Sequence, residues 1–431
     1  MSCSTHVRVL AVGGGAGGFA SVARVQARLG KVGGVTNSPS AVGVLDTAVL
    51  EQHTHLGGQA GTWRHPRGFC FDVGATTLVD AERDVRRWRA PSCGGGMAGA
   101  NEQGVLAHLL SEMGLEFPHD FASVSPPSNP PAVLQDEEAL ETCRLPAYVW
   151  WDERGEPVVL YRDRDAWEAE RARQFPGPEA LKFFALLDEV SSCFWSAARR
   201  GVRLPVSNLR DFVDLACAFP LGDWPMARYA TWSLQDALDA TGASETLPRL
   251  VSLARCLVED TVHSRTLAEA PFVNAALGLT IRGVGLGRAA GGMRGFWDVL
   301  RARYENLGGN VLCGTTVRGI EPLPGGGWRV SATVRAPGGD KGSGGGTRRV
   351  FTCDSLVSGL STQLTASLLP PGHAIRQRLE SFIKRDASDL GGGIVVFLGV
   401  EDSALESGVM PGSPASRFTH HQFISDPSSS L

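Results

Sequence analysis

A glycine-rich turn and one glutamate are the residues whose types and spacing most directly indicate chemistry in this sequence. The turn contains Gly-x-Gly-x-x-Gly at Gly13, Gly15 and Gly18. The first glycine permits a tight turn, the second lets a pyrophosphate approach the backbone, and the third lets a helix pack closely on a strand. The glutamate is Glu51, whose carboxylate can accept hydrogen bonds from ribose hydroxyls. Together they predict a site for the pyrophosphate and ribose of a dinucleotide.

Two strands and a helix must hold the turn and the glutamate in place. Residues 7–12 (VRVLAV) are a short apolar run that predicts a buried parallel strand just before the turn. A helix over about residues 17–29 would direct its N-terminal amides at the phosphates. A second strand, residues 47–51, ends at Glu51. Its distance from the turn exceeds the usual spacing of about 20 residues, and a Gly/Ser/Pro-rich loop over roughly residues 30–41 accounts for the excess.

Two further motifs follow the glutamate. Residues 57–62 are Gly-Gly-Gln-Ala-Gly-Thr, and residues 68–76 are Gly-Phe-Cys-Phe-Asp-Val-Gly-Ala-Thr. The order of an acid, a Gly-Gly-x-x-Gly-Thr turn and a Phe-Asp-x-Gly-Ala segment resembles the flavin-binding N-terminus of the amine oxidase and phytoene desaturase superfamily. Dehydrogenases that bind only NAD lack the second and third motifs. One departure is Gln59, where many relatives have an arginine near the pyrophosphate.

The resemblance implies FAD as the cofactor, with the third motif near the flavin ring. It also implies that the backbone of one later residue, Val317, meets the adenine. The implied cofactor-binding residues are Gly13, Gly15, Gly18, Glu51, Gly57, Gly58, Gly61, Thr62, Gly74, Ala75, Thr76 and Val317. No motif identifies a catalytic base.

A second Gly-x-Gly-x-x-Ala pattern occurs at Gly285, Gly287 and Ala290. We do not expect a second dinucleotide site here, because the following glycines open a helix that relatives place against FAD. Helical spacing puts five apolar or aromatic residues of that helix on one face: Phe296, Val299, Leu300, Tyr304 and Leu307. Gly308 suits the C-terminal cap of this helix.

Four other segments resemble the substrate domain of carotenoid C-3′,4′ desaturases: residues 150–151, 167–177, 391–400 and 420–423. The implied reaction removes two hydrogens from a long apolar polyene, a carotenoid, by hydride transfer to flavin. A carotene cis–trans isomerase on the same fold is an alternative, and an amine oxidase is less expected. An alternative without enzymatic activity is a relative that binds prenylated small GTPases, but those proteins lack an intact phosphate-binding glycine set.

The domain organisation is also implied by the resemblance. The fold would be α/β, with a discontinuous Rossmann-type FAD-binding domain and a mixed α+β substrate domain. The FAD domain would use residues 3–79 and 285–365, and the substrate domain residues 80–284 and 366–431. Relatives continue to a C-terminal glycine-rich helix that covers the flavin, and this sequence ends before such a segment. We therefore expect the 431-residue form to be a fragment or an incomplete gene model, weak in FAD binding and nearly inactive.

Composition excludes several classes of protein. A formal charge of −4 and a pI of about 6.2 provide no basic field for nucleic acid. No run of 18 apolar residues, the length that predicts a membrane span, is present. Nine cysteines are scattered singly, which indicates reduced thiols in a reducing compartment. His420 and His421 have no third metal ligand in view, so we expect no metal.

A helix over residues 181–203 could provide peripheral membrane contact, since carotenoids reside in membranes. It carries an apolar surface followed by Arg199, Arg200 and Arg203. Such a surface suits an interfacial helix that faces anionic lipid. The alternative interpretation is a core helix of the substrate domain with a basic end.

Overall fold

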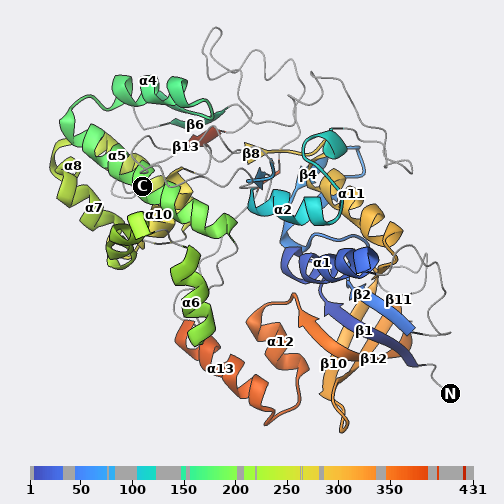
Figure 1. The fold of residues 1–431 in the computed structure, drawn as a ribbon. Coiled ribbons are helices and arrows are strands. Elements are labelled where there is room, and N and C mark those ends of the chain that lie inside the picture. Colours follow the sequence, from blue (N-terminus) through green and yellow to red (C-terminus); the bar gives the residue numbers. More distant parts are fainter. Residues whose placement is uncertain are drawn as a thin grey trace.

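The computed structural model describes residues 4–32, 44–74, 77–82, 104–122, 147–151, 156–200, 208–218, 221–262, 264, 266–280, 286–335, 346–386, 396–397 and 421–423. The described chain is a mixed α/β protein built around a six-stranded sheet of order β10-β11-β12-β1-β2-β9 (Figure 1). A helical region with a small sheet of its own lies beside it. The parallel strands at the centre of the large sheet, with helices on it, define a Rossmann-like arrangement.

The large sheet combines an early and a late part of the chain. Its parallel strands are β1 (Ser4–Val12), β2 (Val44–Leu50), β9 (Asn310–Leu312) and β12 (Gly346–Ser358). Two antiparallel strands, β10 (Thr315–Pro322) and β11 (Trp328–Arg335), complete it beside β12. Strand β1 lies between β12 and β2, so Leu10 is opposite Leu356 on one side and Ala48 on the other. The strand predicted from residues 7–12 is therefore present at the centre of the sheet.

Apolar side chains of β1 pack on both faces of the sheet. On one face Ala11 joins a cluster made with α1 (Ala16–Val32), α2 (Val105–Glu112) and α11 (Gly292–Asn306). On the other face Leu10 and Val12 pack with β10–β12 and Leu369. The short helices α12 (Thr362–Leu368) and α13 (Ala374–Asp386) follow β12. Burial on both faces explains why β1 is a continuous apolar run.

Helix α11 confirms the pattern predicted from its spacing. The residues buried along it are Met293, Phe296, Trp297, Val299, Leu300 and Tyr304. Phe19 of α1 meets two of their rings edge-on, with centroid distances of 5.7 Å to Trp297 and 5.4 Å to Tyr304. Gly308, with φ of +92°, follows the end of the helix as a left-handed residue.

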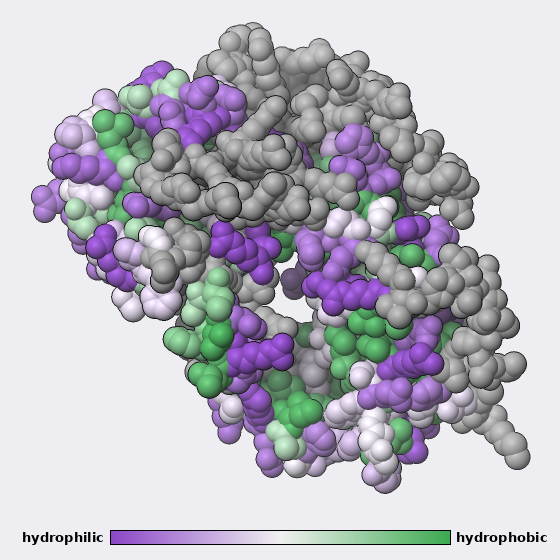
Figure 2. Space-filling view, in the orientation of Figure 1, coloured by the Kyte–Doolittle hydropathy of each residue, from purple (hydrophilic) through white to green (hydrophobic). Residues whose placement is uncertain are grey.

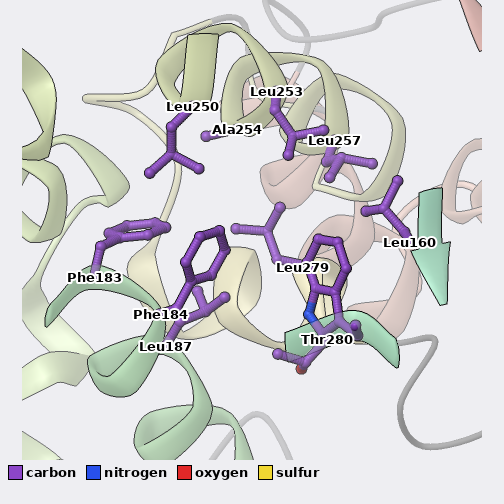
Figure 3. A pocket seen from close by; sticks show the side chains of 11 residues that line it. Leu160, Phe183, Phe184, Leu187, Leu250, Leu253, Ala254, Leu257, Leu279 and Thr280 are labelled. Atoms are coloured by element: carbon purple, nitrogen blue, oxygen red, sulfur yellow. The ribbon is translucent and has the colours of Figure 1, made fainter. Parts of the chain in front are cut away.

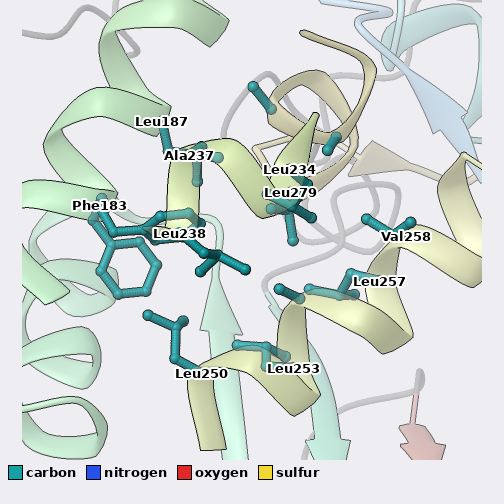
Figure 4. Packing of buried hydrophobic residues seen from close by; sticks show 14 of the residues in the cluster. Phe183, Leu187, Leu234, Ala237, Leu238, Leu250, Leu253, Leu257, Val258 and Leu279 are labelled. Carbon is teal, nitrogen blue, oxygen red and sulfur yellow. The ribbon is translucent and has the colours of Figure 1, made fainter. Parts of the chain in front are cut away.

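The helical region has a second core (Figure 4). Its main helices are α4 (Arg164–Gln174), α5 (Pro178–Arg199), α6 (Leu209–Ala218), α7 (Leu234–Thr241), α8 (Ala243–Thr246), α9 (Pro248–Thr261) and α10 (Phe272–Leu279). The 3-10 segment η3 (Leu221–Thr231) joins α6 to α7. A three-stranded sheet of order β13-β6-β7 lies against these helices, formed by β6 (Ala147–Trp151), β7 (Pro157–Tyr161) and β13 (His421–Phe423).

Helix α5 belongs to this core, and the expectation that it faces lipid is wrong. Phe183, Phe184, Leu187 and Val190 are all buried among α7, α9 and α10. Those helices enclose the apolar side of α5, so this side cannot be presented to a bilayer. The alternative interpretation, a core helix with a basic end, describes α5, which ends at Arg199; Arg203 of the predicted helix lies outside the described residues. Among the residues that the structure describes, no helix is long and apolar enough to cross a membrane.

Two short ribbons complete the described structure. The first pairs β3 (Thr62–Arg64) with β4 (Cys70–Asp72), after the 3-10 turn η1 (Gly58–Ala60). The second pairs β5 (Leu78–Val79) with β8 (Leu286–Gly287). Gly287 of the second glycine pattern therefore lies in an antiparallel ribbon, and the Ala290 amide donates to the Phe121 carbonyl of η2 (His119–Phe121). This ribbon is unlike the strand–turn–helix context of a dinucleotide site. Gly285 lies outside the described residues.

Candidate cofactor site

The turn between β1 and α1 requires two of its glycines for internal packing. Gly13 has φ of +93°, and its amide donates to the Leu50 carbonyl at 2.9 Å. A Cβ at Gly18 would lie 2.2 Å from the Gly13 carbonyl oxygen and 3.2 Å from Gly359 Cα at the end of β12. Contacts this short exclude any side chain. The close approach of α1 to the sheet thus explains Gly13 and Gly18 without any ligand.

Gly15 and Gly17 are different, because nothing in the protein requires them to be glycine. A Cβ at either position would meet no atom within 4 Å, and neither has a positive φ. Both face open space at the start of α1. The first amides of a helix have no intrahelical acceptors and favour an anion. The backbone is therefore left uncovered by side chains at the start of α1.

Glu51 lies directly after β2 with its carboxylate fixed by backbone amides. The residue is 4% exposed. Its Oε2 accepts from the Gly14 amide at 2.7 Å, and its Oε1 accepts from the His53 amide at 2.8 Å. The Glu51 backbone bonds Leu312 on one side and Thr315 on the other. Each carboxylate oxygen keeps a free lone pair, so the group can still accept from a hydroxyl.

The second glycine turn lies against the first. The Gly57 amide donates to the Gly14 carbonyl at 3.0 Å, and Gly15 and Gly57 form an isolated β-bridge. A Cβ at Gly58 would approach Gly15 Cα to 3.3 Å. Trp297 of α11 closes the back of this turn by donating to the Ala60 carbonyl at 2.8 Å. The structure therefore brings the glycines of the first two predicted motifs together.

Asp72 connects the third motif to α11. Its Oδ1 accepts from the Thr62 hydroxyl at 2.7 Å and from the Met293 amide at 3.1 Å. Its Oδ2 pairs with Arg288 at 3.1 Å, and the side chain is only 3% exposed. Asp72 thus caps the N-terminus of α11, where a carboxylate is favoured by the exposed amides. Sequence reasoning placed Asp72 in a flavin motif but did not anticipate this cap, and no local signal pairs positions so far apart.

The remaining predicted residues are placed as follows. Gly61 accepts from the Val73 amide at 2.8 Å, and a Cβ at Gly74 would lie 2.2 Å from the Gln59 carbonyl oxygen. Ala75 and Thr76 lie outside the described residues. Val317 lies half-buried in β10, two residues after Thr315, which bonds the Glu51 backbone. Its predicted contact with adenine stays a prediction.

His55 and Arg294 are polar neighbours of the site that sequence reasoning missed. Burial lowers the pKa of His55, and the positive charge of Arg294 lowers it further. A Cβ at Gly61 would lie 3.4 Å from His55 Nε2. Arg294 itself is held by Asp298, one turn along α11, at 2.8 Å.

The helical region contains an apolar cavity and a surface groove. The cavity, of about 10 Å³, lies between α5, α9 and α10 (Figure 3). Phe183, Phe184 and Leu250 point into it, and the space suits about one water. The aromatic rings here therefore act as core packing. The groove, of about 520 Å³, lies between α4 and α5 beside the Arg171–Asp188 pair.

Among the described residues no group of three His, Cys, Asp or Glu side chains could hold a metal ion. Cys193, Cys256 and Cys353 are buried and Cys217 and Cys313 are more exposed, and none of these five forms a disulfide. Burial raises the pKa of the Cys353 thiol to about 11. A thiol with a raised pKa is a poor nucleophile, so Cys353 acts as an apolar core residue.

Comparison of the sequence with protein-family models and with curated proteins finds no match. Solved structures with a related shape include an oxidoreductase from Methanosarcina mazei, at 16% sequence identity and a TM-score of 0.45. A protein from Pyrococcus furiosus has 14% identity and a TM-score of 0.44. The matches cover 88% and 89% of this chain. The chain spans only 63% and 66% of the length of those two proteins.

Proposed function

We propose that this chain is an FAD-dependent oxidoreductase that binds the cofactor at the carboxyl ends of β1 and β2. One observation carries the proposal: Gly15 and Gly17 are bare glycines in open space, while their neighbours Gly13 and Gly18 are needed for packing. A bound pyrophosphate would account for the two glycines that packing leaves unexplained. The buried carboxylate of Glu51, fixed beside the same turn, supplies the acceptor for a ribose.

The chain's own residues would bind and orient the cofactor. Amides at the start of α1 would hold the phosphates, and the Gly57–Gly58 turn beside Gly15 would leave room for them. Asp72 would fix the β3–β4 ribbon to α11, so that the segment predicted to lie near the flavin ring has a rigid support. When bound, FAD would supply the acceptor for a hydride.

We further propose that the substrate is a carotenoid or other long apolar polyene. This rests on the resemblance of four segments to carotenoid desaturases, of which residues 150–151 and 167–177 lie in β6, α4 and the turn before α5. A cis–trans isomerase would use the same residues toward the cofactor. A relative without enzymatic activity is disfavoured, because the open glycine set is intact.

The cofactor proposal is tested with one substitution and a matched control. Gly15→Val places a side chain where the pyrophosphate would lie, and Gly325→Val places one in equally open space at the β10–β11 turn. We expect Gly15→Val to weaken FAD binding by more than a hundredfold in a flavin-fluorescence titration, with Gly325→Val unchanged. Both should unfold at the same temperature as the parent protein. Equal FAD affinity in all three proteins would contradict the proposal.

The substrate proposal needs a separate measurement. The chain is expressed in a host that produces carotenoids, and the pigments are separated by chromatography with absorbance detection. A desaturase lengthens the conjugated system and shifts absorption to longer wavelength. An isomerase leaves the number of double bonds unchanged. FAD binding with no change in any polyene would refute the substrate assignment while leaving the cofactor assignment intact.

A further inference from the structure

The tip of the β3–β4 ribbon carries an unusual concentration of exposed aromatic rings. Trp63 is 46% exposed and Phe69 is 41% exposed. Trp63 stacks on Phe71 at 5.7 Å, and Phe71 meets Phe397 at 5.0 Å. Val73 and Val396 are also exposed. A contiguous group of exposed apolar side chains is the feature that marks an interaction surface.

Basic residues alternate with these rings in sequence. Arg64 and Arg67 are exposed, and His65 lies edge-on to Trp63 at 5.4 Å. Strand alternation places Arg64 on the opposite side of the ribbon from Trp63, and Arg67 lies in the turn. The one carboxylate between residues 62 and 74 is Asp72, which is buried and paired with Arg288. The solvent-facing part of the ribbon is therefore aromatic and positively charged, in a chain whose net charge is −4.

We infer that this tip, residues 63–71 with Phe397, docks on an anionic lipid surface. Tryptophan and phenylalanine with arginine are the side chains that favour the headgroup level of a bilayer. Aromatic rings and guanidinium groups can lie at the same depth in a lipid headgroup layer. No fixed carboxylate is then needed for each arginine. A folded protein partner would have to supply such carboxylates, since buried unpaired guanidinium groups are costly. A lipid surface therefore fits this combination best.

The position of the tip gives the membrane contact a role in substrate uptake, and this role rests on the proposed function. The tip belongs to the same ribbon as Thr62 and Asp72, which anchor it to α11 beside the candidate cofactor site. A protein that docks by this ribbon would place the cofactor site near the surface from which an apolar substrate is extracted. The membrane contact predicted through α5 is wrong because the apolar side of that helix is buried, whereas the rings of the ribbon tip are exposed.

A second exposed apolar patch provides a matched control. Leu209, Phe212 and Val213 of α6 are exposed, and Figure 2 shows this apolar surface at the lower left of the molecule. Arg210 and Asp214 are both exposed on the same helix, so the patch has no net positive charge, unlike the ribbon tip. Substitutions that remove a comparable apolar area from α6 and from the ribbon tip therefore distinguish general hydrophobic adhesion from docking by the tip.

The experiment is flotation of the full chain with vesicles of phosphatidylcholine, with and without phosphatidylglycerol. The parent should float only with the anionic vesicles, and less so as salt is raised. Arg64→Gln with Arg67→Gln should lose roughly fivefold in partitioning for each arginine. Trp63→Ser with Phe69→Ser should lose roughly tenfold or more. Leu209→Ser with Phe212→Ser, and Arg348→Gln with Arg349→Gln on β12, should float like the parent.

Three outcomes would overturn the docking surface. These are no flotation of the parent, unchanged flotation of both tip variants, and binding of the tip to single-stranded DNA in preference to anionic vesicles. Circular dichroism confirms that each variant is folded. FAD titration of the same proteins separates the two proposals: a chain that floats through its tip but binds no FAD retains the docking surface and loses the proposed function.

Discussion

Arg199 at the end of α5 holds Asp80 through two hydrogen bonds, from Nε to Oδ2 at 3.1 Å and from Nη2 to Oδ1 at 2.9 Å. The two side chains are 7% and 1% exposed. Asp80 also accepts from the Val105 amide at the start of α2, at 2.7 Å, and its own φ is +55°. The pair thus joins the helical region to α2 on the large sheet at the β5–β8 ribbon.

Removing the positive charge of Arg199 should leave the buried carboxylate of Asp80 without its charged partner. We expect Arg199→Met to lower the free energy of unfolding by about 3–5 kcal/mol, the usual cost of leaving one partner of a buried pair uncompensated. Arg210→Met, at an exposed position on α6, should change it by less than about 0.5 kcal/mol. Urea unfolding monitored by circular dichroism measures both. A loss of under 1 kcal/mol in Arg199→Met would mean that water reaches Asp80.

Two adjacent glycines of α1 should respond oppositely to the same change. In Gly18→Ala the new Cβ would meet the Gly13 carbonyl oxygen at 2.2 Å. Because only backbone can give way there, we expect a loss of at least about 1–3 kcal/mol. In Gly17→Ala the Cβ meets nothing, and the higher helix propensity of alanine should stabilise the ligand-free protein by up to about 1 kcal/mol. Thermal unfolding of the two variants without FAD decides between them, and equal melting temperatures would be inconsistent with the packing described.

Glu51 should matter for the ribose as well as for the turn. If Glu51→Ala removes a charged acceptor from a ribose hydroxyl, FAD binding should weaken by about 1.5–3 kcal/mol. Isothermal titration with FAD measures the loss, and Glu321→Ala, at an exposed position of β10, serves as the control. Since Glu51 also accepts from Gly14 and His53, unfolding is measured in parallel. An FAD affinity equal to that of the parent, in a folded variant, would remove Glu51 from the site.

The free energy of unfolding at acid pH should depend on Glu112 of α2. Hydrogen bonds from Arg24 and then Arg28 of α1 lower the pKa of Glu112 to about 2. A folded pKa below the unfolded value of 4.5 gives stability that is present above about pH 4.5 and is lost as pH falls toward 2. His108 of α2 also lies 3.5 Å from this carboxylate. The unfolding free energies of the parent and of Glu112→Gln should therefore converge between pH 5 and pH 2, and a constant difference over that range would contradict the linkage.

Tyr304 should give a late step in an alkaline titration. Burial raises its pKa to about 12, and its hydroxyl lies 2.6 Å from the Thr47 hydroxyl of β2. Stability from this group is present below pH 10 and is lost as pH rises through 12. Absorbance at the tyrosinate band, compared between the parent and Tyr304→Phe, isolates one of the four tyrosines. If the titration component that disappears in Tyr304→Phe has its midpoint near pH 10, the Tyr304 hydroxyl is solvated and the prediction is wrong.

The local part of the site could be predicted from sequence, because its signals lie close together along the chain. A strand of β-branched and apolar residues, a turn whose glycines are spaced for it, and a helix beginning at Ala16 form one continuous unit. Glu51 could be placed because it directly follows the next apolar strand. The buried face of α11 followed from spacing alone, since residues three and four apart share a side of any helix.

What only the tertiary structure decided depends on contacts between distant residues. The same apolar pattern on α5 suits a lipid surface or a protein core, and packing against α7, α9 and α10 settled it as core. Asp72 caps a helix that begins 220 residues later at Gly292, and Asp80 pairs with an arginine 119 positions away. The sequence predicted which residues would bind a dinucleotide, because the glycine turn and the strand that ends at Glu51 are local patterns. The long-range carboxylate partners were decided by the fold, because pairing at such separations depends on where packed elements bring the side chains together.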